Sequence, residues 1–184
     1  EFRRVLFRSL RGGVFEVFSS DHAPYRFEGP DGKKAGMAAG GFKMVPNGIP
    51  GLEIRLASLF SAGVLNDIIS INQFVALTST NHAKMYGLYP RKGTIQVGSD
   101  ADIVIVDTSR ESVIDQGKLH SKSKVSSWHG RKVRGLPVCT MVRGRVIVRD
   151  GVLCGEPGYG RYVTQTQPEP APRNPPRSWI EAPR

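Results

Sequence analysis

Residues 14–29, VFEVFSSDHAPYRFEG, join an apolar run to an adjacent Asp and His. The run is rich in Val and Phe, which favour extended backbone, so we expect a β-strand at about 14–20. Asp21 and His22 follow it directly, and both side chains can bind a metal ion or transfer a proton. A carboxylate at the C-terminal end of a strand occupies the active-site position of an α/β barrel. By itself the pair also fits a plainer interpretation, in which Asp21 caps a turn and His22 packs beside it.

The composition is typical of a soluble globular protein, because 39% of the 184 residues are hydrophobic and 23% are charged. No apolar run approaches the roughly 18 residues that a membrane helix needs, so we expect no membrane association. The two cysteines, Cys139 and Cys154, cannot form a disulfide framework. We expect buried, inert thiols in a reducing cytoplasm.

The net charge of +10 has a largely local origin. Residues 118–149 contain nine Lys or Arg and no Asp or Glu. The stretch lacks the aromatic interleaving of a single-strand binder and matches no zinc-finger, RRM or homeodomain pattern. Basic residues that alternate with Val and Ile indicate the solvent-exposed face of strands, so we expect no nucleic-acid partner.

The first nine residues look foreign to the rest of the chain. VLFRS at 5–9 is what GTG CTC TTC CGA TCT encodes, and this string resembles a sequencing-library adapter read in frame. We therefore expect residues 1–9 to be an adapter artefact, outside the native fold.

The middle of the chain is predicted to be helical. A polar loop at 25–41 and a turn at 45–51 come first. Three helices follow, at 52–63, from Ser70 onward, and at 81–86. Ser70 and Gln73 have the spacing of a capping box, and Gly87 is a suitable C-terminal cap.

After residue 94 the pattern changes to that of strands. Two short β runs are expected within 94–107, and the apolar part at 103–106 should be buried on both faces. Residues 108–135 are polar and predicted to be irregular. Tight turns are predicted at Arg143-Gly144, inside a hairpin, and at Asp150-Gly151.

Four blocks carry a family resemblance. They are SSDHAPYRFEG at 19–29, KMVPNGIPGLEIRL at 43–56, TSTNHAKMYGLYPRKGTIQVGSDADIVIVD at 78–107 and GYGRY at 158–162. In this order they resemble the C-terminal part of the cyclic amidohydrolases, specifically the hydantoinase/dihydropyrimidinase family. The resemblance runs from about Leu10 to Val163, and several ordered blocks are a far more specific signal than one motif.

The resemblance implies an α/β fold, consisting of the C-terminal part of a (β/α)8 amidohydrolase barrel plus part of a small β-sandwich domain. The last barrel strand and the following helices would occupy 10–95, and the β-sandwich and C-terminal segment would occupy 96–163. The Pro-rich residues 164–184 are expected to be a disordered tail. The full-length protein is expected to form a homotetramer or homodimer.

The resemblance also implies roles for two residues. Asp21 matches an aspartate at the end of the eighth barrel strand, which ligates one of two zinc-type divalent ions and acts as general base. Asn47 matches the residue whose backbone holds the cyclic amide of the substrate. His22 matches a histidine that is not among the usual metal ligands. The family's other metal ligands and its catalytic tyrosine precede the eighth strand, so we expect this chain to be an inactive fragment.

The resemblance implies hydrolysis of a hydantoin or 5,6-dihydropyrimidine to the N-carbamoyl amino acid. Tyr25 after Asp-His-Ala-Pro fits this group, whereas dihydroorotases commonly have His there and allantoinases usually depart from Ala23. Non-catalytic, dihydropyrimidinase-like scaffold proteins typically lose the metal-binding Asp, which is retained here as Asp21. These alternatives, and a basic nucleic-acid-binding module, remain open at this point.

Overall fold

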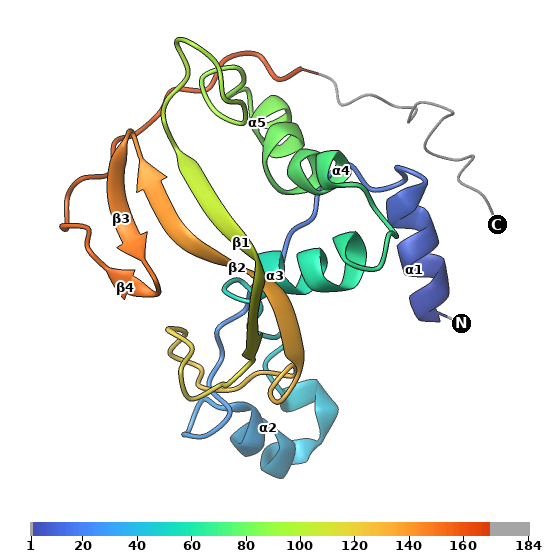
Figure 1. Cartoon of the computed structure of the whole chain (residues 1–184). Coiled ribbons are helices and arrows are strands. Elements are labelled where there is room, and N and C mark those ends of the chain that lie inside the picture. The colour runs from blue at the N-terminus through green and yellow to red at the C-terminus, as the bar shows by residue number, and fades with distance from the viewer. Residues whose placement is uncertain (1, 170–184) are drawn as a thin grey trace.

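The computed structural model describes residues 2–169, which form an open antiparallel sheet with helices against it (Figure 1). The sheet has the order β1-β2-β3-β4, and the helices lie to one side of it. The helices are α1 (Phe2–Arg11), α2 (Lys33–Gly40), η1 (Phe42–Met44), α3 (Arg55–Leu59), η2 (Phe60–Val64), α4 (Ile71–Val75), η3 (Ala76–Thr80) and α5 (Asn81–Met85). The strands are β1 (Ile103–Val113), β2 (Lys132–Val142), β3 (Arg145–Arg149) and β4 (Val152–Leu153).

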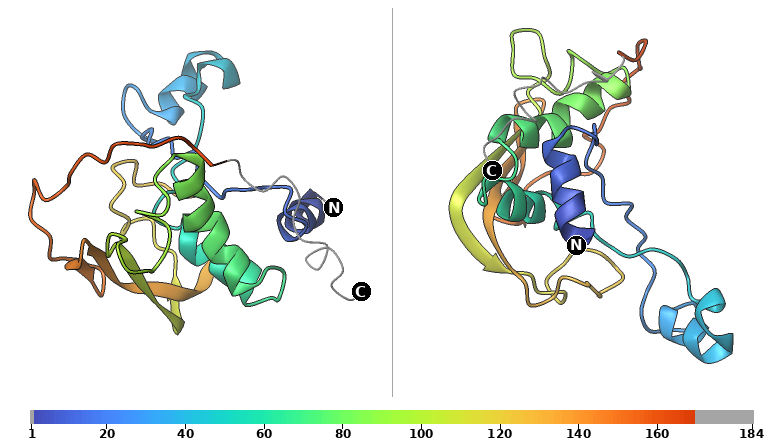
Figure 2. Two further views of the ribbon diagram at one scale, coloured as in Figure 1. Left: turned by 90° about the horizontal axis from the view of Figure 1, so that it is seen from above. Right: turned by 90° about the vertical axis from the view of Figure 1, so that its right-hand side faces the viewer.

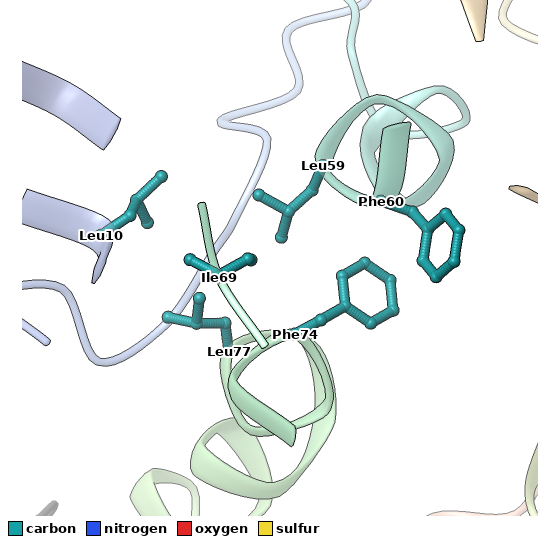
Figure 3. Close-up of a cluster of buried hydrophobic side chains, with 6 residues drawn as sticks. All are labelled: Leu10, Leu59, Phe60, Ile69, Phe74 and Leu77. Atoms are coloured by element: carbon teal, nitrogen blue, oxygen red, sulfur yellow. The ribbon is translucent and has the colours of Figure 1, made fainter. Parts of the chain in front are cut away.

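The main hydrophobic core lies between the helices (Figure 3). The ring of Phe60 meets that of Phe74 edge to face, with centroids 5.5 Å apart, and Leu59 is only 3% exposed. The six buried members of this core are Leu10, Leu59, Phe60, Ile69, Phe74 and Leu77. Five of them come from three helical segments and Ile69 comes from the loop before α4, so the core holds α1, α3–η2 and α4–η3 together.

The helix boundaries follow local sequence signals. The predicted capping box is present, because Gln73 N donates to Ser70 Oγ at 3.1 Å and Ser70 N donates to Gln73 Oε1 at 2.9 Å. Gly87 follows α5 with φ of 63°, the left-handed conformation of a helix C-terminal cap. The helix predicted at 52–63 begins later, at Arg55, and continues as a wider π-type turn through Val64.

Two tight turns set the register of the sheet, and both were predicted. Arg143 and Gly144 have φ of 46° and 78°, and Asp150 and Gly151 have φ of 48° and 80°. Positive φ at both central residues matches the right-handed twist of the flanking strands. The first turn joins β2 to β3 and the second joins β3 to β4.

The sheet packs on the helices through a position that only glycine can occupy. Gly135 on β2 has φ of 85°, and a Cβ there would lie 2.1 Å from Cδ1 of Phe60. A second buried cluster, formed by Ile54, Ala57, Ile114 and Val133, continues the contact between α3 and β2. The backbone of β2 therefore packs directly against the ring of Phe60 in η2.

The strand predicted at 14–20 is wrong as a strand. The segment is extended but joins no ladder, because no strand of the described residues runs beside it. Helical residues bind its backbone instead. Phe18 N donates to Leu77 O at 2.8 Å, Asn81 Nδ2 donates to Glu16 O at 2.7 Å, and the guanidinium of Arg55 donates to Phe18 O.

Three further expectations about the β region differ from the structure. The first β run, at 94–97, is a loop with Ile95 and Val97 exposed. Residues 103–106 are not buried on both faces, because β1 is an edge strand that leaves Val104 and Ile105 about half exposed. The interval 108–135, predicted irregular, contains the second half of β1 and the start of β2. The strands form one open sheet, and neither a closed barrel nor a second sheet occurs within residues 2–169.

Residues 22–51, here called the arm, project from the rest of the chain, here called the body (Figure 2). The arm carries α2 and η1 and has no apolar core of its own. Within it only Gly32, Gly36 and Pro50 are buried, whereas Phe42 is 83% exposed. The chain returns to the body where α3 begins.

The ends of the chain also differ from expectation. Residues 1–9 were predicted to lie outside the native fold, but residues 2–9 form most of α1, and Phe7 packs against the core; their adapter origin stays a prediction. The tail predicted to be disordered begins in contact with α5, since Thr166 N donates to Gly87 O at 2.8 Å. Residues 170–184 lie outside the described part. Within that part, no helix has the length and apolar character needed to cross a bilayer.

Candidate active site

Asp21 lies where the extended segment leaves the body and enters the arm. Its φ of 44° is in the left-handed region, which is uncommon for a residue other than glycine and is often found at functional positions. Its side chain is exposed, and within residues 2–169 no hydrogen bond engages its carboxylate. Arg55, whose pKa is lowered by burial, donates to Phe18 O, three residues before Asp21. The carboxylate is thus free to accept a proton or a ligand.

Asn47 lies on the irregular loop at 45–51, here called the turn, which returns the arm toward Asp21. The two segments meet in parallel at a single bridge between His22 and Ile49, and Ala23 N donates to Ile49 O at 3.1 Å. Gly48 has φ of 85°, and a Cβ there would lie 2.5 Å from the Cβ of Ala23. The structure therefore brings the two sequence-predicted site residues, Asp21 and Asn47, to neighbouring segments at one end of the arm.

His22 connects the same two segments through its side chain. Its Nδ1 accepts hydrogen bonds from Gly51 N at 3.1 Å and from Leu52 N at 3.3 Å. Both partners are N–H donors, so the proton of the neutral ring lies on Nε2. No functional role was predicted for His22, because no motif links positions 22 and 51. The available signal was a turn rich in Pro and Gly with unpaired N–H groups, which need an acceptor.

A cleft of about 640 Å³ lies on the other side of this turn. His22 and Leu52 line it on the arm side, and Pro137, Val148 and Leu153 of the sheet line it opposite. At its rim Glu53 holds a loop of the body, because His120 Nδ1 lies 2.8 Å from Oε1 and His120 N donates to Oε2 at 2.8 Å. The turn is thus supported from the body as well as from the arm.

A further contact holds the other end of the turn. Nζ of Lys33, on α2, donates to Pro46 O. The tight fit of α2 against this region also excludes side chains, since a Cβ at Gly36 would lie 2.3 Å from Met44 O. The turn that carries Asn47 is consequently clamped at both ends, by Lys33 before it and by His22 after it.

The described residues offer few donors for the expected metal ions. Among residues 2–169, no three His, Cys, Asp or Glu side chains are placed to hold a metal ion together. His82 lies 3.3 Å from Phe18 O through Nε2 and stacks on Tyr86, while His129 Nδ1 accepts from Gln116 N. Asp21 can supply one oxygen ligand, and a metal there needs its other ligands from outside these residues.

Comparison with known proteins identifies the family of the chain. The sequence profile of the amidohydrolase family matches residues 5–147, and the chain belongs to that family. Over 159 residues the chain is 45% identical to the D-hydantoinase of Ralstonia pickettii, which covers 86% of this chain and 34% of the relative. It is 41% identical over 165 residues to the D-hydantoinase of Geobacillus stearothermophilus, covering 90% and 34%.

The solved structures give the same result. The dihydropyrimidinase from Brevibacillus agri NCHU1002 superposes with a TM-score of 0.84 at 38% identity, covering 90% of this chain and 35% of that one. The chain spans about a third of the length of the curated relatives it matches. The resemblance to hydantoinases and dihydropyrimidinases is therefore confirmed, and the arrangement of residues 2–169 is that of a segment of those proteins.

Proposed function

We propose that the chain is the part of a metal-dependent cyclic amidohydrolase that supplies the general base, Asp21, and a substrate-binding turn at Asn47. The observation that carries the proposal is the meeting of these two segments at the bridge between His22 and Ile49. An exposed, unengaged carboxylate beside a fixed turn can serve as the general base in hydrolysis of an amide bound at that turn. The identities of the relatives support a hydantoin or 5,6-dihydropyrimidine as substrate.

The roles of the two residues follow from their chemistry. Asp21 accepts a proton from the attacking water as the new C–O bond forms at the ring carbonyl. It returns this proton to the ring nitrogen as the C–N bond breaks, so that the product is an N-carbamoyl amino acid. The backbone of Asn47 binds the cyclic amide, and a turn suits this role because peptide groups outside helices and strands can point at a ligand. A divalent ion such as zinc supplies polarisation of the carbonyl and a lowered pKa of bound water.

The proposal also includes a barrel fold, which belongs to a protein longer than this chain. The packing of 10–95 as the last strand and following helices of a (β/α)8 barrel, and of 96–163 as part of a β-sandwich, is consistent with the covered third of the relatives. Two metal ions, a homotetramer or homodimer, and a cytoplasmic location belong to the same proposal.

A hybrid enzyme tests the function. Residues 10–163 replace the matching third of the Ralstonia pickettii D-hydantoinase, and the purified protein is supplied with zinc or manganese. We expect release of N-carbamoyl amino acid from hydantoin, measured by chromatography, at a rate well above metal salt alone. The unaltered relative is the positive control. A hybrid that is folded and metal-loaded but inactive contradicts the proposal.

A further inference from the structure

We propose that His22 is a positioning residue, which holds the turn carrying Asn47 at a fixed place beside Asp21. The effect of this positioning on catalysis rests on the proposed function. The contacts that support the positioning itself lie entirely within residues 2–169. His22 is half-buried and next to Asp21 in the chain, so any shift of its ring is transmitted to both segments.

The ring of His22 binds the end of the turn through two donors at once. Gly51 N lies 3.1 Å and Leu52 N lies 3.3 Å from the same Nδ1 atom. Successive N–H groups that converge on one acceptor fix the direction of the backbone as well as its distance. These residues are the last of the turn before the chain re-enters the body at Arg55. His22 therefore fixes the point at which the chain leaves the turn and returns to the body.

The backbone alone gives little support at this place. The contact between the two segments is one isolated bridge, with a single hydrogen bond from Ala23 N to Ile49 O. A lone bridge lacks the repeated hydrogen bonds of a ladder, so it permits the segments to slide. The second clamp, from Lys33 to Pro46 O, originates within the arm and moves with it. Besides that single backbone hydrogen bond, the imidazole of His22 ties the turn to the Asp21 segment itself.

Substitutions at position 22 can separate the effect of the acceptor atom from the effect of the ring's shape. Asparagine at position 22 places its amide oxygen close to where Nδ1 lies, so it can accept from the same N–H groups. Glutamine carries its oxygen one methylene farther out, and phenylalanine keeps the ring but has no acceptor. A positioning role requires His22→Asn to preserve the contact and His22→Phe to lose it.

The first test uses the full 184-residue chain and needs no catalysis. Long-range proton–nitrogen NMR should show His22 with Nδ1 unprotonated and Nε2 protonated. Amide exchange of Gly51 and Leu52 should become about tenfold faster in His22→Phe and stay close to the original rate in His22→Asn. A protonated Nδ1, or exchange that is equal in all three proteins, overturns the inference even if a variant folds poorly.

The second test uses the hybrid enzyme. His22→Phe should raise KM for hydantoin about tenfold while kcat stays within about threefold, because binding at the turn is lost before chemistry at Asp21. His22→Asn should restore KM, and His22→Gln should not. Equal losses in the Asn and Phe variants, or a loss confined to kcat, would overturn the positioning role. If the unsubstituted hybrid has no activity, the proposed function fails, and the NMR result alone decides on His22.

Discussion

The arm and the body of this protein differ in what holds them together. The body is built on two buried clusters, in which Leu59, Phe60 and Phe74 are nearly inaccessible to solvent. The arm has only two glycines and one proline buried, and its large apolar side chains face outward. Its shape depends on individual hydrogen bonds and on glycine contacts that leave no room for a Cβ.

This difference separates stability from chemistry. Hydrophobic burial contributes most of the free energy of folding, so the body accounts for most of the stability. Asp21 and Asn47 lie at the junction of the body with the arm and are both exposed. Residues that act on a ligand need access, and they are commonly placed on loops supported by a rigid scaffold. A substitution should therefore affect either stability or activity, according to the region that it changes.

The largest expected effect is a loss of activity without a loss of stability. Asp21→Asn in the hybrid enzyme should lower kcat for hydantoin at least about a thousandfold, because the general base is removed. The side chain is exposed, so the melting temperature should hardly change. Asp31→Asn, at an exposed aspartate within the arm, is the matched control and should retain activity. Near-normal turnover of Asp21→Asn on hydantoin would rule out its role.

The next largest effect is a loss of stability, which should be large for a substitution in the body and small for one in the arm. Leu59→Ala should lower the free energy of unfolding by about 2–5 kcal/mol, because it leaves a cavity in the main core. Phe42→Ala, on the exposed surface of the arm, should change it by no more than about 0.5 kcal/mol. Urea titration of the 184-residue chain measures both. Equal effects would mean that the arm has a core of its own.

A smaller and local effect should appear at the junction. A side chain at Gly48 would meet the Cβ of Ala23 and adopt an unfavourable φ, so Gly48→Ala should open the bridge to Ile49. Exchange of the Ala23 amide should become about tenfold faster while the urea midpoint stays the same. Adding Ala23→Gly should recover part of the protection, since it removes the overlap but not the backbone strain. A shifted urea midpoint would show that arm and body unfold together.

The smallest effect depends on pH and belongs to the loop before β1. Hydrogen bonds from Lys92 and Arg91 hold the pKa of Asp100 below its usual range. A carboxylate whose pKa is lowered on folding stabilises the protein above its unfolded pKa, near 3.9, and loses this contribution as the pH falls below it. The melting temperature of Asp100→Asn should thus lie below that of the original chain at pH 7. The gap should close as the pH falls below about 4, and a constant gap would contradict this.

Sequence reasoning succeeded where the determinants of structure are local. The capping box at Ser70 and the turns at Arg143 and Asp150 each depend on residues within a few positions of one another. It failed at 14–20, because a strand forms only if another strand runs alongside, and no local pattern specifies that. The burial of 103–106 was misjudged for the same reason, since the place of β1 at the edge of the sheet is a property of the whole sheet.

In the candidate site, too, the features set by local sequence were predicted and those set by long-range contacts were not. Asp21 and Asn47 were found through the resemblance of their motifs, which are short and contiguous. Their proximity, and the role of His22 in it, depend on a contact between positions 22 and 51 that no spacing predicts. Asp21 and Asn47 as functional residues stay predictions until the substitutions described above are measured.

The extended segment at 14–20 has a consequence for the order of folding. Its backbone partners are Arg55, Leu77 and Asn81, and the bonds from Arg55 and Asn81 span 37 and 65 residues. Loops of this length close slowly, whereas the helical turns that supply the partners form on their own. A ribosome makes the segment before any of these partners, so its polar groups remain bound to water until α5 has emerged. Asp21 is therefore synthesised early and takes its final position late.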